Sequence, residues 1–135
     1  MAEKPPARKA LIVDDEPDCR EFVRAILETD GWEIAEAADG AAGLAQAKAL
    51  RPDLIVLDVE MPKRSGFDVF KELVEDPALA KTRVIMLTGV AEKTGLRFSA
   101  EDMAGFLGRE PDAYVEKPID PAALKRVIAR VAGAK

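Results

Sequence analysis

Short, almost uninterrupted apolar runs recur along the chain at 10–13, 53–58, 83–88 and 113–116. Runs of this length are typical of parallel strands that are covered on both faces. A fifth run, 32–37, interleaves apolar residues with glutamates and is therefore expected at an edge of the sheet. The pattern predicts five strands, four of them with a strongly apolar character.

The stretches between these runs carry apolar residues at helical spacing. We predict helices over roughly 17–30, from a cap at Asp39 to about Leu50, from Ser65 or Gly66 onward, and from a cap at Asp120 to near Gly133. Proline at the first helical position supports the first and last of these helices, and Arg51-Pro52 ends the second.

Three of the predicted helices have a distinct apolar face. On the first helix that face includes Cys19, which favours a core position over a reactive thiol. The three faces consist of Cys19, Phe22, Val23, Ile26 and Leu27; of Phe67, Phe70, Leu73 and Val74; and of Leu124, Val127, Ile128 and Val131.

Strands that alternate with helices predict an α/β domain with a parallel sheet and right-handed crossovers. The chain has 135 residues, enough for one core and too few for two. We expect a flexible lead over 1–8, one domain over 9–133 and no output domain.

Composition and charge narrow the function. The net charge of -5 argues against direct nucleic-acid binding. The absence of histidine excludes a Ser-His-Asp triad, histidine-ligated zinc and a phosphohistidine carrier, and the single cysteine excludes an internal disulfide. No segment has the length of a membrane span or of a signal-peptide core, so we expect no membrane insertion and a cytoplasmic location.

Polar residues with matching chemistry follow the apolar runs. They are Asp14, Asp15, Asp58, Thr88 and Lys117. In open parallel sheets, ligands bind outside the carboxyl ends of the strands, which is where all five are expected. Three clustered carboxylates repel one another unless a cation shares the site, and Mg²⁺ prefers such oxygen ligands. This set suits a hard cation and a phosphoryl group.

Each of these residues also has an ordinary structural interpretation. The Asp14-Asp15 pair could be a solvated turn, Asp58 a turn residue that caps backbone donors, Thr88 a buried strand hydroxyl and Lys117 a surface charge. The functional interpretation rests on the combination, because five residues of suitable chemistry all fall at strand ends.

The motifs around these residues resemble those of a known family. They are Val-Asp-Asp-Glu-Pro at 13–17, the run from Pro-Asp-Leu to Glu-Met-Pro at 52–62, Leu-Thr-Gly at 87–89 and Tyr-Val-Glu-Lys-Pro at 114–118, together with Gly66. From about residue 9 to 131, the chain resembles the receiver domains of bacterial two-component response regulators, and in particular single-domain chemotaxis regulators. The resemblance implies a flavodoxin-like, doubly wound (βα)5 fold with strand order 2-1-3-4-5.

The resemblance also implies roles for the site residues. Asp58 would accept a phosphoryl group from a phosphohistidine. Mg²⁺ would be bound by Asp15 directly, by Asp14 at least partly through water, by Asp58 and by the backbone carbonyl of Glu60. Lys117 would offset phosphoryl charge, and a cis bond between Lys117 and Pro118 would direct its ammonium into the site.

The implied switch involves Thr88 and Tyr114. The Thr88 hydroxyl would move to a phosphoryl oxygen, and Tyr114 would rotate inward and change a surface that a partner recognises. The alternative for Tyr114 is a half-buried strand aromatic without a switching role.

Two features depart from the family pattern. The segment 89–112 is longer than usual by roughly two helical turns, so a displaced fourth helix or an added loop is expected there. Glu60 is the second feature, because its carboxylate could hold a metal-bound water or repel incoming anions.

We therefore predict a receiver that is not an enzyme beyond its own phosphorylation and dephosphorylation. Its expected partners are a sensor histidine kinase or phosphotransfer protein and a downstream protein target, with a homodimer possible. One alternative is a receiver-like binding module that works without phosphate. Another is a Mg²⁺-dependent phosphohydrolase, which the short chain and the position of Glu60 relative to Asp58 count against.

Overall fold

The computed structural model describes residues 8–59, 61, 66–79, 82–88, 112–117 and 119–131. In chain order its elements are β1 (Lys9–Val13), α1 (Pro17–Thr29), β2 (Glu33–Ala37), α2 (Gly40–Leu50), β3 (Leu54–Asp58), α3 (Gly66–Glu75), a 3-10 turn (Pro77–Leu79), β4 (Arg83–Thr88), β5 (Ala113–Glu116) and α5 (Pro121–Val131). Each of these strands and helices was predicted, and their bounds agree to within about two residues.

The five strands form one parallel sheet with the order β2-β1-β3-β4-β5, which confirms the predicted doubly wound topology. Strand β2 lies at an edge, as its polar pattern predicts. The register pairs Val13 with Leu57 and Thr88 with Glu116. The carboxyl ends of β1, β3, β4 and β5 therefore lie at one edge of the sheet.

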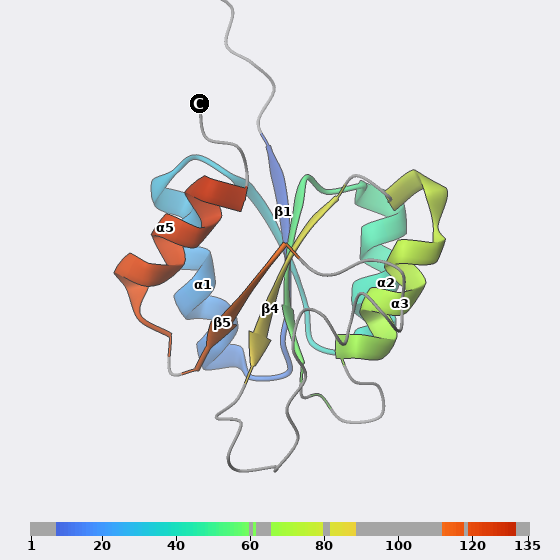
Figure 1. Cartoon of the computed structure of the whole chain (residues 1–135), viewed down its shortest axis with the longest axis horizontal. Coiled ribbons are helices and arrows are strands. Elements are labelled where there is room, and N and C mark those ends of the chain that lie inside the picture. Colours follow the sequence, from blue (N-terminus) through green and yellow to red (C-terminus); the bar gives the residue numbers. More distant parts are fainter. Residues whose placement is uncertain are drawn as a thin grey trace, which may run out of the picture.

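Helices cover both faces of the sheet, with α1 and α5 on one side and α2 and α3 on the other (Figure 1). Side chains alternate along β1, so that Ile12 packs with the first pair of helices and Leu11 with the second. Residues Leu54 to Leu57 of β3 are all buried because the strand is central and covered on both faces. The end of β3, which carries Asp58, thus belongs to a strand that is buried on both faces.

Two predicted apolar faces need correction. Phe22 was assigned to the core face of the first helix but is 38% exposed, because it lies about 100° round the helix from Val23. On α3 the buried side chains include Val69, which was not predicted, whereas Phe67 and Val74 are only partly buried at the margin of that core. Period alone locates the centre of a helical face more accurately than its limits.

The predicted helix caps are present. Ala42 donates its backbone N–H to the carboxylate of Asp39 at 2.8 Å, and Ala123 donates to Asp120 at 2.9 Å. Helix α2 ends at Leu50. The next residue, Arg51, has a left-handed φ of 50° and is followed by Pro52. These local signals set both ends of α2 and the beginning of α5.

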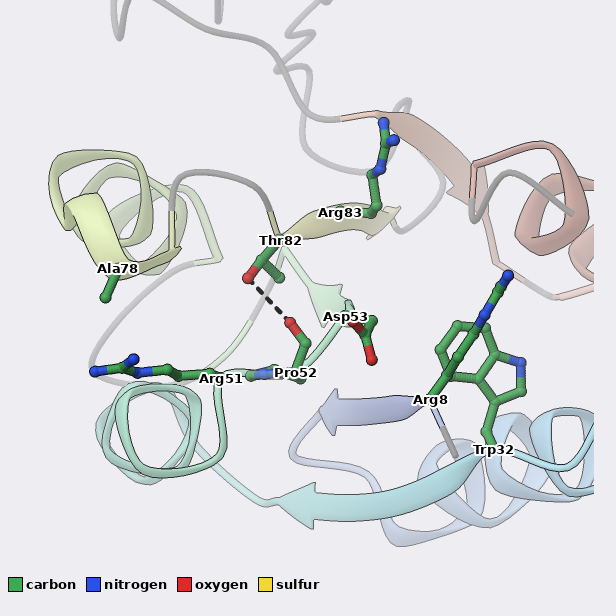
Figure 2. Close-up of a pocket in the computed structure, with 8 residues that line it drawn as sticks. All are labelled: Arg8, Trp32, Arg51, Pro52, Asp53, Ala78, Thr82 and Arg83. Atoms are coloured by element: carbon green, nitrogen blue, oxygen red, sulfur yellow. Dashed lines mark hydrogen bonds between the residues drawn. The ribbon is translucent and has the colours of Figure 1, made fainter. Parts of the chain in front are cut away.

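A cavity of about 340 Å³ lies at the amino end of the strands, opposite to the edge that carries the acidic residues. It is lined by Arg8, Trp32, Arg51, Pro52, Asp53, Ala78, Thr82 and Arg83 (Figure 2). The hydroxyl of Thr82 donates to the carbonyl of Pro52 at 3.0 Å, and the guanidinium of Arg8 lies 5.4 Å from the ring centroid of Trp32. The arginine side chains extend to different sides of the cavity, so they form no convergent anion site.

The lengthened segment predicted at 89–112 lies outside the described residues, apart from Asp112. The same holds for Glu60 and Pro118, and so for the predicted cis bond and carbonyl ligand. Within the described part of the chain, no helix has the length and apolar character needed to cross a membrane.

Candidate functional site

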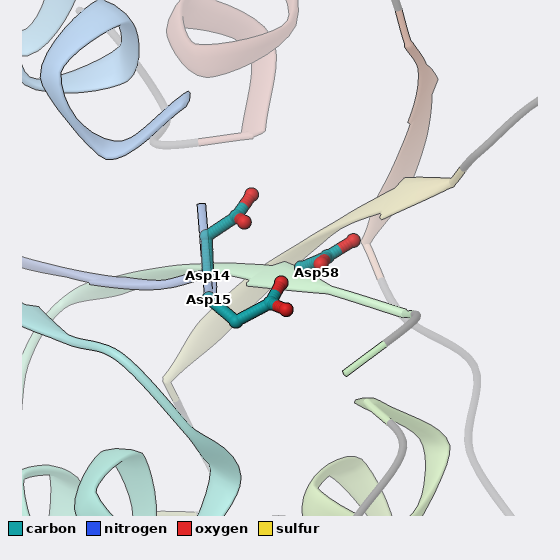
Figure 3. A group of neighbouring side chains, drawn as sticks. All are labelled: Asp14, Asp15 and Asp58. Atoms are coloured by element: carbon teal, nitrogen blue, oxygen red, sulfur yellow. The ribbon is translucent and has the colours of Figure 1, made fainter. Parts of the chain in front are cut away.

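Three carboxylates meet at the carboxyl ends of β1 and β3. Each of Asp14, Asp15 and Asp58 contributes an oxygen to a group in which all three atoms lie within 4.8 Å of one another (Figure 3). Asp14 and Asp58 are 0% and 2% exposed, and Asp15 is half-buried. They meet because β1 and β3 are adjacent, with Val13 opposite Leu57. The sequence placed these three side chains at one site, and the structure brings them together.

The ammonium of Lys117 lies between two of these carboxylates. Its Nζ is 3.1 Å from Oδ2 of Asp14 and 3.3 Å from Oδ1 of Asp58. Lys117 directly follows β5, and its backbone N–H donates to the carbonyl of Thr88 at 2.8 Å. The end of β5 is therefore tied to the end of β4, and the long side chain reaches past β4 to the cluster.

Lys117 stays positively charged in this position. Burial lowers the pKa of the Lys117 ammonium, but the charge of Asp58 and the hydrogen bond and charge of Asp14 outweigh that effect. The net result is a pKa above the ordinary value for lysine. A permanent cation thus faces two buried carboxylates and offsets part of their negative charge.

Cys19, near the start of α1, lies beside Asp14, and its thiol is expected to be unreactive. Burial raises the pKa of its thiol to about 12, with a further contribution from the hydrogen bond and charge of Asp14. Its half-buried side chain packs against the core beneath α1 and α5. These observations favour the predicted core position, since a protonated thiol is a poor nucleophile.

The two predicted switch residues are both half-buried. Thr88 is the last residue of β4, and Tyr114 lies opposite Met86 in β5, packed against the core beneath α2 and α3. Thr88 is therefore at the same sheet edge as the carboxylates. Tyr114 lies two residues before Glu116, the residue of β5 that pairs with Thr88, and so is farther from that edge. Their switching roles stay predictions.

Two polar contacts at the site were not predicted. Glu16 places a carboxylate oxygen 3.5 Å from Nζ of Lys117, and Arg20 donates from Nη1 to the backbone carbonyl of Asp14 at 2.7 Å. Both residues lie close to the Asp14-Asp15 motif in sequence, but no residue pattern indicated either contact. The contact of Arg20 ends on a backbone carbonyl, which any residue type would supply. The contact of Glu16 with Lys117 depends on how the fold brings β5 close to the end of β1.

The position of Gly66 leaves no room for a side chain. Its backbone N–H donates to the carbonyl of Val59 at 2.7 Å, which brings the start of α3 against the end of β3. A Cβ atom at Gly66 would overlap the carbonyl oxygen of Asp58 and lie 2.8 Å from Cα of Val59. Because these are backbone atoms, a larger residue would displace the chain directly after Asp58.

The donor set of the cluster fits a small divalent cation. The three predicted ligands that the structure describes all offer carboxylate oxygens, and two of these three residues are buried. Lys117 supplies one positive charge against these three negative charges. The remaining negative charge and the all-oxygen chemistry favour a hard metal over zinc or copper.

Comparison with known sequences agrees with this geometry. The model of the response regulator receiver domain family matches residues 10–129. The chain belongs to this receiver domain family. The transcriptional regulator TcrX of Mycobacterium tuberculosis is 40% identical to it over 109 residues, which cover 80% of the chain and 42% of TcrX. The phosphate regulon regulator PhoB of Escherichia coli is 34% identical over 93% of the chain and 50% of PhoB. The receiver chain spans about half the length of these relatives.

Solved receiver structures share the fold. The chemotaxis protein CheY4 of Vibrio cholerae aligns with a TM-score of 0.77 and 31% identity, covering 93% of this receiver and 98% of CheY4. The receiver domain of the sensor histidine kinase PA1611 of Pseudomonas aeruginosa aligns with a TM-score of 0.78 and 26% identity, covering 95% and 99%. That structure is described with a magnesium ion coordinated in its active site cleft.

Proposed function

We propose that this receiver takes a phosphoryl group from a phosphohistidine onto Asp58 in a Mg²⁺-dependent reaction. The donor would be a sensor histidine kinase or a phosphotransfer protein. The observation that carries the proposal is the group of three carboxylates with Lys117 between Asp14 and Asp58. Family membership supports it, because receivers act as phosphoacceptors in two-component systems.

Asp14, Asp15 and Asp58 would hold the metal. Their oxygens lie close enough to share one ion, and a related receiver is described with magnesium in its active site cleft. We expect Asp15 to bind directly and Asp14 at least partly through water, with the carbonyl of Glu60 as a further ligand. When bound, Mg²⁺ would offset negative charge on the oxygens of the transferring group.

Asp58 would act as the nucleophile. One of its carboxylate oxygens attacks phosphorus, the P–N bond to the donor histidine breaks, and the histidine leaves with the electrons of that bond. Asp58 ends the fully buried strand β3, so its position is well defined before the donor arrives. Lys117, 3.3 Å from Asp58, can move its ammonium onto a phosphoryl oxygen.

The receiver would act only on itself, since the acceptor is its own side chain. This distinguishes it from a magnesium-dependent phosphohydrolase, which would turn over a separate substrate. TcrX and PhoB are named as transcriptional regulators, and this chain corresponds to about half of each. We propose that the output is a protein contact, made either with a separate partner or within a longer protein.

Intact mass tests this function. After incubation with acetyl phosphate and Mg²⁺, we expect the mass to increase by one phosphoryl group, and we expect no increase with excess chelator. Equal addition with and without metal would contradict the Mg²⁺ requirement. No addition from either acetyl phosphate or a phosphorylated histidine kinase would favour a phosphate-independent binding module.

We further propose that phosphorylation is transmitted through Thr88 and Tyr114. Support comes from their places on adjacent strands, and from the bond between the carbonyl of Thr88 and the backbone of Lys117. If the Thr88 hydroxyl moved toward a phosphoryl oxygen on Asp58, it would leave space beside β5. Tyr114 could then turn inward and change the surface around β5 and α5.

Fluorotyrosine labelling tests this switch, because the chain has a single tyrosine. We expect the ¹⁹F resonance of Tyr114 to shift on phosphorylation in the wild type and to keep its position in Thr88→Ala, with phosphoryl incorporation confirmed by mass. Thr29→Ala is the control, since Thr29 is exposed at the end of α1. A full shift in phosphorylated Thr88→Ala would contradict the proposed coupling.

A further inference from the structure

Arg20 links the site to the edge of the sheet. Its side chain is 18% exposed and makes two directed bonds. Nη1 donates to the backbone carbonyl of Asp14 at 2.7 Å, and Nε donates to Oε1 of Glu36 at 3.1 Å. Arg20 lies in the first turn of α1, whereas Glu36 lies in the edge strand β2. The guanidinium on α1 therefore joins the residue that follows β1 to the edge strand β2.

The carbonyl that accepts from Arg20 belongs to the peptide that joins Asp14 to Asp15. Because a peptide is planar, fixing that oxygen also fixes the direction in which the chain enters Asp15. Asp14 is also held at other points: its N–H donates to the carbonyl of Ala37 at 3.1 Å, its Oδ1 accepts from the N–H of Glu16 at 2.9 Å, and its Oδ2 accepts from Lys117 at 3.1 Å. Arg20 thus controls the one peptide that lies between two carboxylates of the cluster.

Glu36 is itself well anchored. Its Oε2 accepts from Nη1 of Arg24 at 2.7 Å, and its backbone carbonyl accepts from the side-chain amide of Gln46 at 2.7 Å. Glu36 is therefore held from α1 at its carboxylate and from α2 at its backbone carbonyl. This is the kind of outer support that orients metal ligands, and its loss typically weakens metal affinity by about 10- to 100-fold.

We propose that Arg20, oriented by Glu36, is a positioning residue for the Mg²⁺ site. The proposal rests on the proposed function, because it assumes that Asp14, Asp15 and Asp58 bind the metal. The positive charge of Arg20 and its orienting role predict opposite effects of its removal on Mg²⁺ affinity. If Arg20 acted only through its positive charge, its removal would strengthen binding of a cation. If it orients the Asp14-Asp15 peptide, its removal weakens binding.

Calorimetric titration of the metal-free protein with Mg²⁺ distinguishes these two cases. We expect Arg20→Gln to bind Mg²⁺ about tenfold more weakly than the wild type. Arg20→Lys should also bind more weakly, because an ammonium keeps the charge but cannot reproduce the planar pair of bonds. Lys125→Gln is the control for charge: it also removes one positive charge, but Lys125 is exposed on α5 and is not part of the contacts that orient Arg20. It should stay within about twofold of the wild type.

Amide exchange provides a second measurement that needs no metal. The N–H of Glu16 is bonded to Asp14, so its exchange reports on order in this loop. We expect faster exchange at Glu16 in Arg20→Gln than in Lys125→Gln, with thermal unfolding showing that both variants are folded. Mg²⁺ affinity in Arg20→Gln equal to or above that of the wild type would overturn the proposal. If the wild type binds no Mg²⁺, the proposed function fails. If amide exchange at Glu16 is also unchanged in Arg20→Gln, Arg20 does not order the loop and the positioning role fails separately.

Discussion

Asparagine in place of Asp58 is expected to abolish phosphoryl incorporation. The neutral amide keeps the size of the side chain but is not a competent nucleophile, so the covalent route itself is lost. We expect the rate of phosphoryl addition from acetyl phosphate, followed by intact mass, to fall by at least about a thousandfold. Asp58 is 2% exposed and pairs with Lys117, so the substitution acts at a well-defined buried position.

Asp53→Asn is the control for this variant. Asp53 immediately precedes the same strand, at the opposite edge of the sheet, where its carboxylate accepts from the backbone of Lys9. It should be phosphorylated at the rate of the wild type, and both variants should show cooperative thermal unfolding. Phosphorylation of Asp58→Asn at the wild-type rate would move the acceptor to another carboxylate, with Asp14 and Asp15 the first to examine.

Glutamine in place of Lys117 is expected to have opposing effects on stability, metal affinity and phosphorylation. The side chain of Lys117 is 21% exposed, and the side chains of its two buried partners, Asp14 and Asp58, are 0% and 3% exposed. Loss of its charge leaves these carboxylates without their cation, which should lower the free energy of unfolding of the metal-free protein by about 3 kcal/mol. Mg²⁺ should bind more tightly, since it no longer competes with an ammonium. Phosphorylation should nevertheless slow by about a hundredfold, because a charge on the phosphoryl oxygens goes uncompensated.

Urea unfolding with chelator and with Mg²⁺, calorimetric titration and intact mass measure these three effects. Lys125→Gln is the control, because Lys125 is exposed on α5 and distant in sequence from the acidic motifs. If Lys117→Gln is phosphorylated at the wild-type rate and its stability is unchanged, the contacts of Lys117 with Asp14 and Asp58 contribute neither to stability nor to phosphorylation.

The fold was predictable because each apolar run has a length and pattern that suit one place in a parallel sheet. Runs such as 83–88 required a covered central strand, and the interleaved glutamates of β2 required an edge. The meeting of Asp14, Asp15 and Asp58 followed from the same logic, since the carboxyl ends of neighbouring parallel strands lie at one edge.

Other parts of the site could not be predicted from residue pattern. The bond from Arg20 to the carbonyl of Asp14 ends on a backbone atom, which any residue type would supply. The contact of Glu16 with Lys117 joins positions 101 residues apart and depends on β5 lying beside β4. Phe22 was misplaced because helical period indicates a direction and not the width of the buried face.

Location of the phosphoryl group on the wild-type protein tests the central claim most directly. Borohydride reduces an acyl phosphate to an alcohol with release of phosphate, and so converts a phosphorylated aspartate to homoserine that peptide mass spectrometry can place. After incubation with acetyl phosphate and Mg²⁺, we predict homoserine at position 58 and nowhere else, and none when the metal is chelated. Homoserine at position 14 or 15, or at position 58 to the same extent without metal, would contradict the account.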